Sequence, residues 1–307
     1  MKGFKRCFAL LFFLKVGSIF SQLSPSNGVP ASSMNQIAIT NVDVYVRPDL
    51  KVENATILIE NGKIKNVGKL LFIPDGYAVY NREGFTVLPA FVELNTDLGV
   101  EKARPTYTGG MPQLESKKSG DYYWNESIHP EVNAVSILSS QDQGLQNLSS
   151  LGFGFALTHQ SDGIVRGSGP LVALGPLTKS EQIMASNAAM FYSFEKGVSN
   201  QTYPSSLMGS IALLRQAFYD LRYFSSNRSA ALGKQSMEPW AQSVDKPSFF
   251  HATSKWDILR ANKIAYEFSM PFIYFATGEE YSILDELKRN NVKLVAPINF
   301  PQPFDIS

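Results

Sequence analysis

The sequence predicts an α/β protein: a (β/α) barrel of the TIM type, preceded by a small β-sandwich. Residues 36–88 are rich in strand patterns. After them, short apolar strands alternate with helical patterns, which favours parallel strands joined by right-handed crossovers. A length of 307 residues accommodates both parts. An open, doubly wound sheet is the alternative. We find about six candidate barrel strands, whereas a closed barrel needs eight, so the barrel is expected to be incomplete at its C-terminus.

Residues 1–22 have the layout of a cleaved secretory signal peptide. Lys2, Lys5 and Arg6 form a basic start, an apolar stretch follows, and Ser21 is a small residue suited to cleavage. The sequence therefore predicts an exported protein, either periplasmic or secreted. An uncleaved N-terminal anchor is the alternative.

The composition narrows the classes of partner. The formal net charge of +1 provides no basic footprint, so a nucleic-acid partner is not expected. No run of 18 consecutive apolar residues follows the leader, so no membrane span is expected in the processed chain. The single cysteine, Cys7, lies in the leader, and export would leave no thiol for a disulfide or a metal. Residues 23–35 are rich in Ser, Pro and Asn and are expected to be a linker.

The β-sandwich is predicted over residues 36–88. Residues 37–46 and 55–60 alternate between apolar and polar side chains, and residues 63–67 continue the pattern after Asn61-Gly62. Asn-Gly between alternating runs is a strong hairpin signal, because a type I′ turn needs positive φ at both central residues. Two further short strands are expected, at residues 77–80 and 85–88.

The barrel domain is predicted over residues 89–307. Its expected strands are residues 91–94, 153–158, 171–174, 248–252, 272–276 and 292–296. Its expected helices are residues 131–151 (as one helix or two), 206–224, 254–268 and 279–290. The longest of these has an apolar stripe at steps of three and four residues. Long irregular segments are expected at residues 101–127 and 225–247, and a chain break is expected at Gly167-Ser168-Gly169.

Three segments together resemble the metal-dependent amidohydrolase superfamily, specifically its imidazolonepropionase-like branch. Residues 55–76 are similar to that family's N-terminal sandwich, and residues 84–93 to its entry into the barrel. Phe250-His251-Ala252 is similar to a later strand that carries a metal-binding histidine. The resemblance implies a barrel enzyme that uses a divalent metal, zinc in relatives, to hydrolyse C–N bonds in cyclic amides.

The residues at the implied metal positions depart from the family pattern. Where the family has His-x-His after the acidic residue of the first strand, this chain has Asn95 and Asp97. Residues i and i+2 of a strand point to one face, so both could reach one ion. An amide and a carboxylate suit magnesium or calcium better than zinc. Asn95, Asp97 and His251 are thus the candidate metal positions, zinc binding is expected to be weak or absent, and no catalytic residue is assigned.

The three histidines allow structural interpretations as well. His251 is either a surviving metal ligand or a core histidine, and His159 either belongs to a site at the end of its strand or lies in a loop. His129 precedes a proline at an expected helix start and is interpreted as a capping residue.

The predicted function is that of an exported amidohydrolase-superfamily protein with little or no hydrolysis by this chain alone. The expected partners are a small amide-type ligand and the remainder of a longer chain. The alternative is a non-catalytic exported module that binds a ligand on the same scaffold.

Overall fold

The computed structural model describes residues 35–105, 112–139, 141–229 and 232–298. The expected leader, and all of the expected linker except Asn35, lie outside the described residues. The chain divides into two compact units between Pro89 and Ala90. Each unit is described by itself.

The N-terminal unit contains one five-stranded sheet. Its strands are β1 (Gln36–Arg47), β2 (Leu50–Glu60), β3 (Lys63–Gly68), β4 (Ala78–Asn81) and β5 (Thr86–Val87). The order is β3-β2-β1-β4, and β5 pairs with the second half of β1. Val42, Val44, Ala55 and Ile57 form its buried centre. The described residues thus form a single sheet where a two-layered sandwich was expected.

The predicted hairpin is confirmed. β2 and β3 pair antiparallel up to Glu60 and Lys63, and the two residues between them are Asn61 and Gly62. Their φ angles are +49° and +73°, the positive values that a type I′ turn requires.

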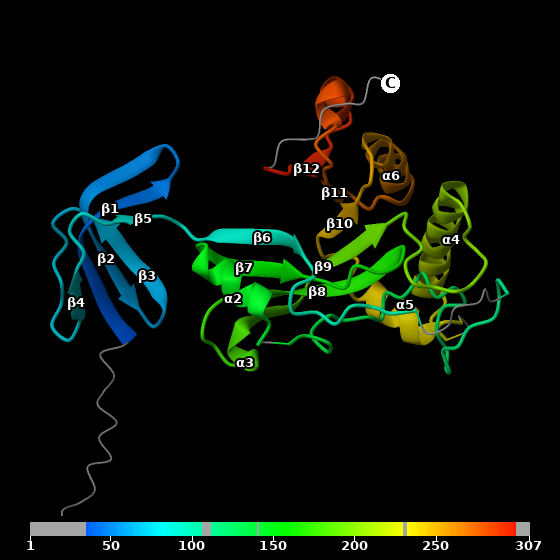
Figure 1. Cartoon of the computed structure of the whole chain (residues 1–307), viewed down its shortest axis with the longest axis horizontal. Helices are drawn as coiled ribbons and strands as arrows, with labels where there is room; N and C mark the ends of the chain where they lie inside the picture. The colour runs from blue at the N-terminus through cyan, green and yellow to red at the C-terminus, as the bar shows by residue number, and fades with distance from the viewer. Residues whose placement is uncertain (1–34, 106–111, 140, 230–231, 299–307) are drawn as a thin grey trace, which may run out of the picture. The chain divides into compact units, whose positions relative to one another are not determined.

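The C-terminal unit is built on a seven-stranded mixed sheet (Figure 1). Its strands are β6 (Phe91–Thr96), β7 (Phe153–Thr158), β8 (Val165–Ala173), β9 (Ile183–Ser193), β10 (Ser248–His251), β11 (Phe272–Phe275) and β12 (Lys293–Val295). They follow one another in sequence order across the sheet. β6 and β7 are parallel, and so are β9 to β12, whereas β8 runs antiparallel to both of its neighbours. Among the described residues, β6 and β12 are the edges of an open sheet.

Two long helices and several short ones accompany this sheet. They are α2 (Gln143–Ser150), α3 (Lys179–Gln182), α4 (Leu207–Ser226), α5 (Lys234–Ala241), α6 (Lys255–Phe268), the 3-10 helix η2 (Glu280–Ile283) and α7 (Leu284–Arg289). α4 begins after Ser206, whose side chain accepts a hydrogen bond from the Gly209 N–H, and α6 begins after Ser254, which accepts one from the Asp257 N–H. Both serines satisfy donors that the first turn leaves free.

The core of the C-terminal unit consists largely of aromatic side chains from β9 to β11 and from α4 to α6. Phe218 of α4 packs in tilted geometry against Trp240, Phe268 and Phe272, with ring centroids 5.0 to 6.5 Å apart. The indole N–H of Trp240 donates to the hydroxyl of Tyr192 at 2.9 Å. A buried polar atom therefore has a partner inside an otherwise apolar core.

Two expectations between residues 131 and 174 are wrong. Residues 131–139 form turns and isolated bridges, and among the described residues of the expected helical stretch 131–151 only α2 is helical. The backbone explains this result, because Ala134 donates to Ser168 and Ser168 donates to Val132, so these groups bond to β8 and not within a helix. Gly167-Ser168-Gly169 lies inside β8 and does not break the chain. Irregular register on both sides of the glycines accommodates them within the strand.

Three further differences concern later segments. The segment expected to be irregular over residues 225–247 contains α5, and β9 was not predicted. The helix expected over residues 279–290 begins as η2 and becomes α-helical only in α7. The predicted parallel arrangement is confirmed for β6 with β7 and for β10 to β12, and it is wrong for β8, which is antiparallel. Among the described residues, no helix combines the length and the apolar character that crossing a membrane requires.

Gly167 is expected to be the least replaceable glycine of β8. Its φ is +83°, and a Cβ at this position would lie 2.0 Å from the Val132 carbonyl oxygen. Gly175 has a φ of +136° but open space around it. We expect Gly167→Ala to lower the free energy of unfolding by at least about 2 kcal/mol more than the matched control Gly175→Ala, which carries backbone strain alone. Urea denaturation followed by tryptophan fluorescence measures both, and equal losses would contradict the close approach.

Candidate functional site

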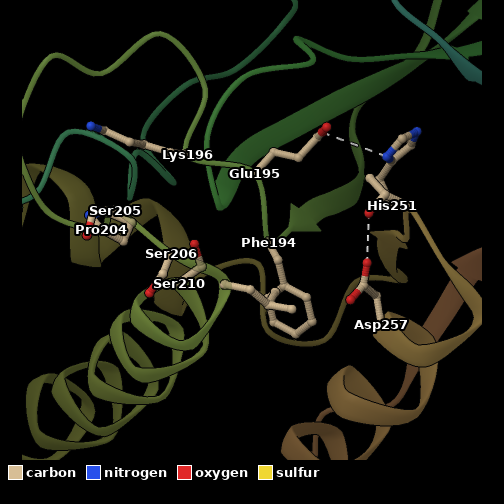
Figure 2. Close-up of a pocket in the computed structure, with 11 residues that line it drawn as sticks. Phe194, Glu195, Lys196, Pro204, Ser205, Ser206, Ser210, His251 and Asp257 are labelled. Atoms are coloured by element: carbon tan, nitrogen blue, oxygen red, sulfur yellow. Dashed lines mark hydrogen bonds and ion pairs between the residues drawn. The ribbon is translucent and has the colours of Figure 1, made fainter.

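A cavity of about 460 Å³ lies at the carboxyl ends of β9 and β10 (Figure 2). We call it the β9–β10 pocket, and its polar lining includes Glu195, Lys196, Ser206, Ser210, His251 and Asp257. The two strands are parallel, so their carboxyl ends meet at one edge, and α4 and α6 begin soon after them. Ligands of open α/β sheets bind at such an edge.

An ion pair between β8 and the segment after β9 borders the pocket. The Arg166 side chain is 3% exposed, and its Nη2 donates to Glu195 Oε2 at 2.6 Å. Its Nε donates to the Gly163 carbonyl oxygen. The same carboxylate oxygen lies 3.9 Å from His251 Nδ1. Arg166 thus neutralises the carboxylate that faces the histidine.

His251 is at the last position of β10 and lines the pocket. Burial and the positive charge of Arg166 lower the pKa of its imidazole, while Glu195 opposes them. Its Nδ1 is buried and has no hydrogen-bond partner. The imidazole is therefore neutral at neutral pH, with an unused ring nitrogen.

Asp257 closes the other side of the pocket, in the first turn of α6 (Figure 2). Its carboxylate is buried and accepts from the Thr253 hydroxyl at 2.7 Å and from Arg260 Nη1 at 3.0 Å. Both oxygens therefore have donors, and the positive end of α6 adds to their stabilisation.

His159 follows β7 and is 2% exposed. Its Nδ1 lies 3.3 Å from the Thr96 carbonyl oxygen, which can only accept, so the proton of the neutral ring is on Nδ1. Nε2 then has a free lone pair, and it has no partner. Burial, with the charges of Arg166 and His251, lowers the pKa of His159 to about 3.

The candidate metal positions have different surroundings. Asn95 is exposed, and its backbone N–H donates to Glu93. Asp97 Oδ2 forms an ion pair with Lys102 Nζ at 3.5 Å and lines a separate cavity of about 150 Å³. His251 lines the β9–β10 pocket. The three are placed in the same unit, but Asp97 and His251 belong to different cavities.

The donor set does not fit a zinc site. Over the described ranges, no three His, Cys, Asp or Glu side chains gather closely enough to hold a metal ion. Asn95 contributes an amide and Asp97 is paired with a lysine, whereas zinc in proteins prefers imidazole and thiolate donors.

The capping role expected of His129 is wrong, because no helix begins beside it in the described residues. His129 is 4% exposed, and its Nε2 lies 3.4 Å from Asp162 Oδ2. The other oxygen of Asp162 accepts from the Val198 N–H at 2.7 Å. Asp162, in the turn before β8, thus connects the segment of His129 to the loop after β9.

Sequence reasoning missed Arg166, Glu195 and Lys196. Arg166 stands beside glycines that were interpreted as a break, and the other two follow a strand that was not predicted. A charged residue flanked by Val165 and Gly167 in an apolar stretch was the available signal, since buried charges need partners.

Comparison with solved structures reveals a likeness to amidohydrolases. An amidohydrolase from Thermotoga maritima is similar with a TM-score of 0.69 and 21% identity, over 85% of this chain and 70% of its own. An N-acyl-D-glutamate deacylase from Bordetella bronchiseptica, complexed with zinc and a phosphonate inhibitor, has a TM-score of 0.41 and 12% identity, over 85% and 57%. A prolidase complexed with n-methylphosphonate-l-proline has a TM-score of 0.38 and 11% identity, over 87% and 79%.

These likenesses concern the fold. The first shows that this chain has a mixed α/β fold shared with an amidohydrolase structure. The other two are too weak to extend that result. No protein-family model and no curated protein matches the sequence.

His159 is expected to make stability depend on pH. An unfolded chain binds a proton on this side chain below about pH 6.5, while the folded chain does not until about pH 3. Within this window, the free energy of unfolding therefore falls as the pH falls, by up to about 1.4 kcal/mol per pH unit. Between about pH 7.5 and pH 4.5, the wild type should lose about 2 to 3 kcal/mol more than His159→Gln. Urea denaturation at both pH values measures this, and parallel losses would contradict it.

Proposed function

We propose that this chain is an amidohydrolase-type protein that binds a small amide-type ligand in the β9–β10 pocket, with weak or no hydrolysis by the chain alone. The pocket is the observation that carries the proposal. It lies at the carboxyl edge of the sheet, in a fold shared with an amidohydrolase. Its volume of about 460 Å³ is within the range of small-molecule sites.

The pocket offers groups that suit an amide. The half-exposed carboxylate of Glu195 is an acceptor for an amide N–H, and the imidazole of His251 lines the pocket beside it. Hydroxyls of Ser206 and Ser210 can donate to its carbonyl oxygen. These groups account for recognition of an amide. The weak-hydrolysis part of the proposal rests on Asn95 and Asp97, which stand where relatives have two imidazoles.

A non-catalytic exported binding module is the second candidate. The ion pair of Asp97 with Lys102 favours it, because this pair occupies the carboxylate nearest to the family's first metal position. On this proposal, the scaffold is retained and the ligand is bound without turnover.

We also propose that the open sheet is part of a barrel and the N-terminal sheet part of a sandwich, each completed by the remainder of a longer chain. Apolar side chains on the N-terminal unit support a missing layer, since they stand 47 to 99% exposed: Ile64, Leu70, Phe72, Val79, Tyr80, Phe85 and Leu88. Exposed apolar surface of this extent marks a place where another element binds.

Export remains a proposal that rests on the basic and apolar pattern of residues 1–22. Cleavage after Ser21 should leave a processed protein that begins at Gln22. N-terminal sequencing of the protein from the export compartment measures this. An intact Met1 on membrane-embedded protein would contradict it.

Hydrolysis and binding can be tested together. The purified protein should show saturable binding of a small N-acyl amide but turnover near the blank rate, with or without added zinc, because the donor set lacks the paired imidazoles. Ligand-observed NMR measures binding, chromatography measures product, and elemental analysis measures bound zinc.

A restored site is the control. Asn95→His combined with Asp97→His should raise zinc occupancy, whereas wild-type protein should hold well below one equivalent after dialysis. Stoichiometric zinc with turnover in the wild type, both lost in Asp97→Ala, would contradict weak hydrolysis. Absence of saturable binding would contradict the pocket's role.

A further inference from the structure

A cavity of about 550 Å³ lies between α4, the start of α5 and residues 121–124. We call it the α4–α5 pocket, and it shares no lining residue with the β9–β10 pocket. We propose that the α4–α5 pocket binds a small organic cation, an alkylated ammonium group, against its aromatic rings and beside the carboxylate of Asp220. The inference concerns a second site and does not depend on the proposed function.

Aromatic side chains form much of the wall of this pocket. Tyr122, Tyr123 and Trp124 are consecutive in the chain, and Tyr223 of α4 is the fourth. The rings of Tyr123 and Trp124 are tilted by 36°, with centroids 5.8 Å apart. The face of an aromatic ring carries partial negative charge and attracts a cation that lies within about 6 Å. Such a wall suits an ammonium group whose alkyl substituents also bury apolar surface.

Tyr122 already attracts a cation of the chain itself. Lys118 Nζ lies 5.3 Å from the centre of its ring. Lys118 also forms an ion pair with Glu131, and neither of these two residues lines the pocket. Tyr223 has no such cation among the described residues, and it is 57% exposed. It therefore presents a ring that a ligand can reach.

Asp121 has a structural task at the pocket. Its two oxygens accept from the backbone N–H of Gly233 at 2.6 Å and from that of Lys234 at 3.1 Å. These contacts hold the start of α5 against residues 121–124, and the positive end of the helix stabilises the carboxylate. The side chain of Lys234 donates to the Ser229 carbonyl oxygen. Asp121 therefore shapes the pocket, and the start of α5 already stabilises its charge.

Asp220 differs from Asp121 because both of its donors are neutral side chains. Its Oδ2 accepts from the Tyr123 hydroxyl at 2.7 Å, and its Oδ1 accepts from Gln216 Nε2 at 2.8 Å. Burial, and after it the contact with Asp220, raises the pKa of Tyr123, so this hydroxyl remains a donor. Within the described ranges, Asp220 forms no ion pair. A negative charge in a fixed position is thus left beside the aromatic wall.

The rings and the carboxylate together select the kind of cation. A metal ion such as calcium prefers a shell of oxygen ligands, whereas this pocket presents Asp220 among aromatic rings. An alkylated ammonium group can contact the rings and pair with the carboxylate at the same time. The volume of about 550 Å³ also leaves room for a substituent on the ammonium group.

Choline and its uncharged carbon isostere test this assignment on the intact protein. In the isostere a tert-butyl group replaces trimethylammonium, so the two probes differ chiefly in charge. Ligand-observed NMR titration of the methyl resonance gives each dissociation constant. At low salt, we expect choline to bind at least about fivefold more tightly than the isostere. Added sodium chloride should reduce this preference, because salt screens the charge of Asp220.

Variants separate the carboxylate from the ring. Asp220→Asn should reduce the preference below about twofold and leave binding of the isostere unchanged, because asparagine keeps an acceptor for the Tyr123 hydroxyl. Tyr223→Leu should weaken binding of choline more than that of the isostere, while Tyr223→Phe should retain the preference. Urea denaturation checks that each variant folds.

Asp245→Asn is the matched control. Asp245 is an exposed carboxylate that pairs with Lys246, and it lies outside the pocket. Its replacement removes the same charge and should leave the preference for choline intact.

Three results would overturn the proposal. Equal binding of choline and the isostere by the wild type would make the pocket an apolar cleft. A preference for choline that survives both Asp220→Asn and Tyr223→Leu would place the cation elsewhere on the protein. Displacement of choline by an equal concentration of calcium, in an Asp220-dependent manner, would replace the organic cation by a metal ion. Binding of an amide in the β9–β10 pocket is measured separately, so either proposal can fail while the other stands.

Discussion

The ion pair between Arg166 and Glu195 determines the electrostatics of the carboxyl edge of the sheet. A guanidinium that is 3% exposed needs a counter-charge, because an unpaired buried charge costs several kcal/mol. Glu195 supplies that charge from the segment after β9. Burial and, after it, the charge of this guanidinium lower the pKa of both His159 and His251, so two imidazoles at this edge remain neutral. The ion pair thus adds to the effect of burial, and both together leave imidazole nitrogens at this edge unprotonated.

Local chemistry explains which elements could be predicted from the sequence. The turn at Asn61-Gly62 and the helix start at Ser254 depend on residues within a few positions, and both are confirmed. Gly167 behaves differently. Glycine is required at this position because the backbone comes close to Val132, a residue distant in sequence. From the neighbouring residues alone, the glycines predict only a break in the strand. β9 was not predicted for the same reason, because its position is defined by pairing with β8 and β10 and not by its local sequence.

The residues of the candidate site also differ in whether the sequence alone could identify them. His251 is found from sequence because a resemblance at Phe250-His251-Ala252 points to it, and the structure places it on a pocket. The ion pair between Arg166 and Glu195 could not be predicted from sequence, because only the antiparallel pairing of β8 with β9 brings the two residues together. Asn95 and Asp97 match the family's metal positions, but the Asn95 backbone N–H donates to Glu93 and the Asp97 side chain pairs with Lys102.

The reversed direction of β8 has a consequence for how the chain folds. Leu171 pairs with Ala185 across a short connection, whereas Met190 of β9 pairs with Ser248 only after α4 and α5 have been traversed. β7 also pairs with β8 across a short connection, and closing short loops costs less entropy, so we expect the β7–β8–β9 ribbon to form before β10 joins it. During synthesis, this ribbon leaves the ribosome before β10 and the later strands exist. It then provides the template on which the parallel strands are added one after another.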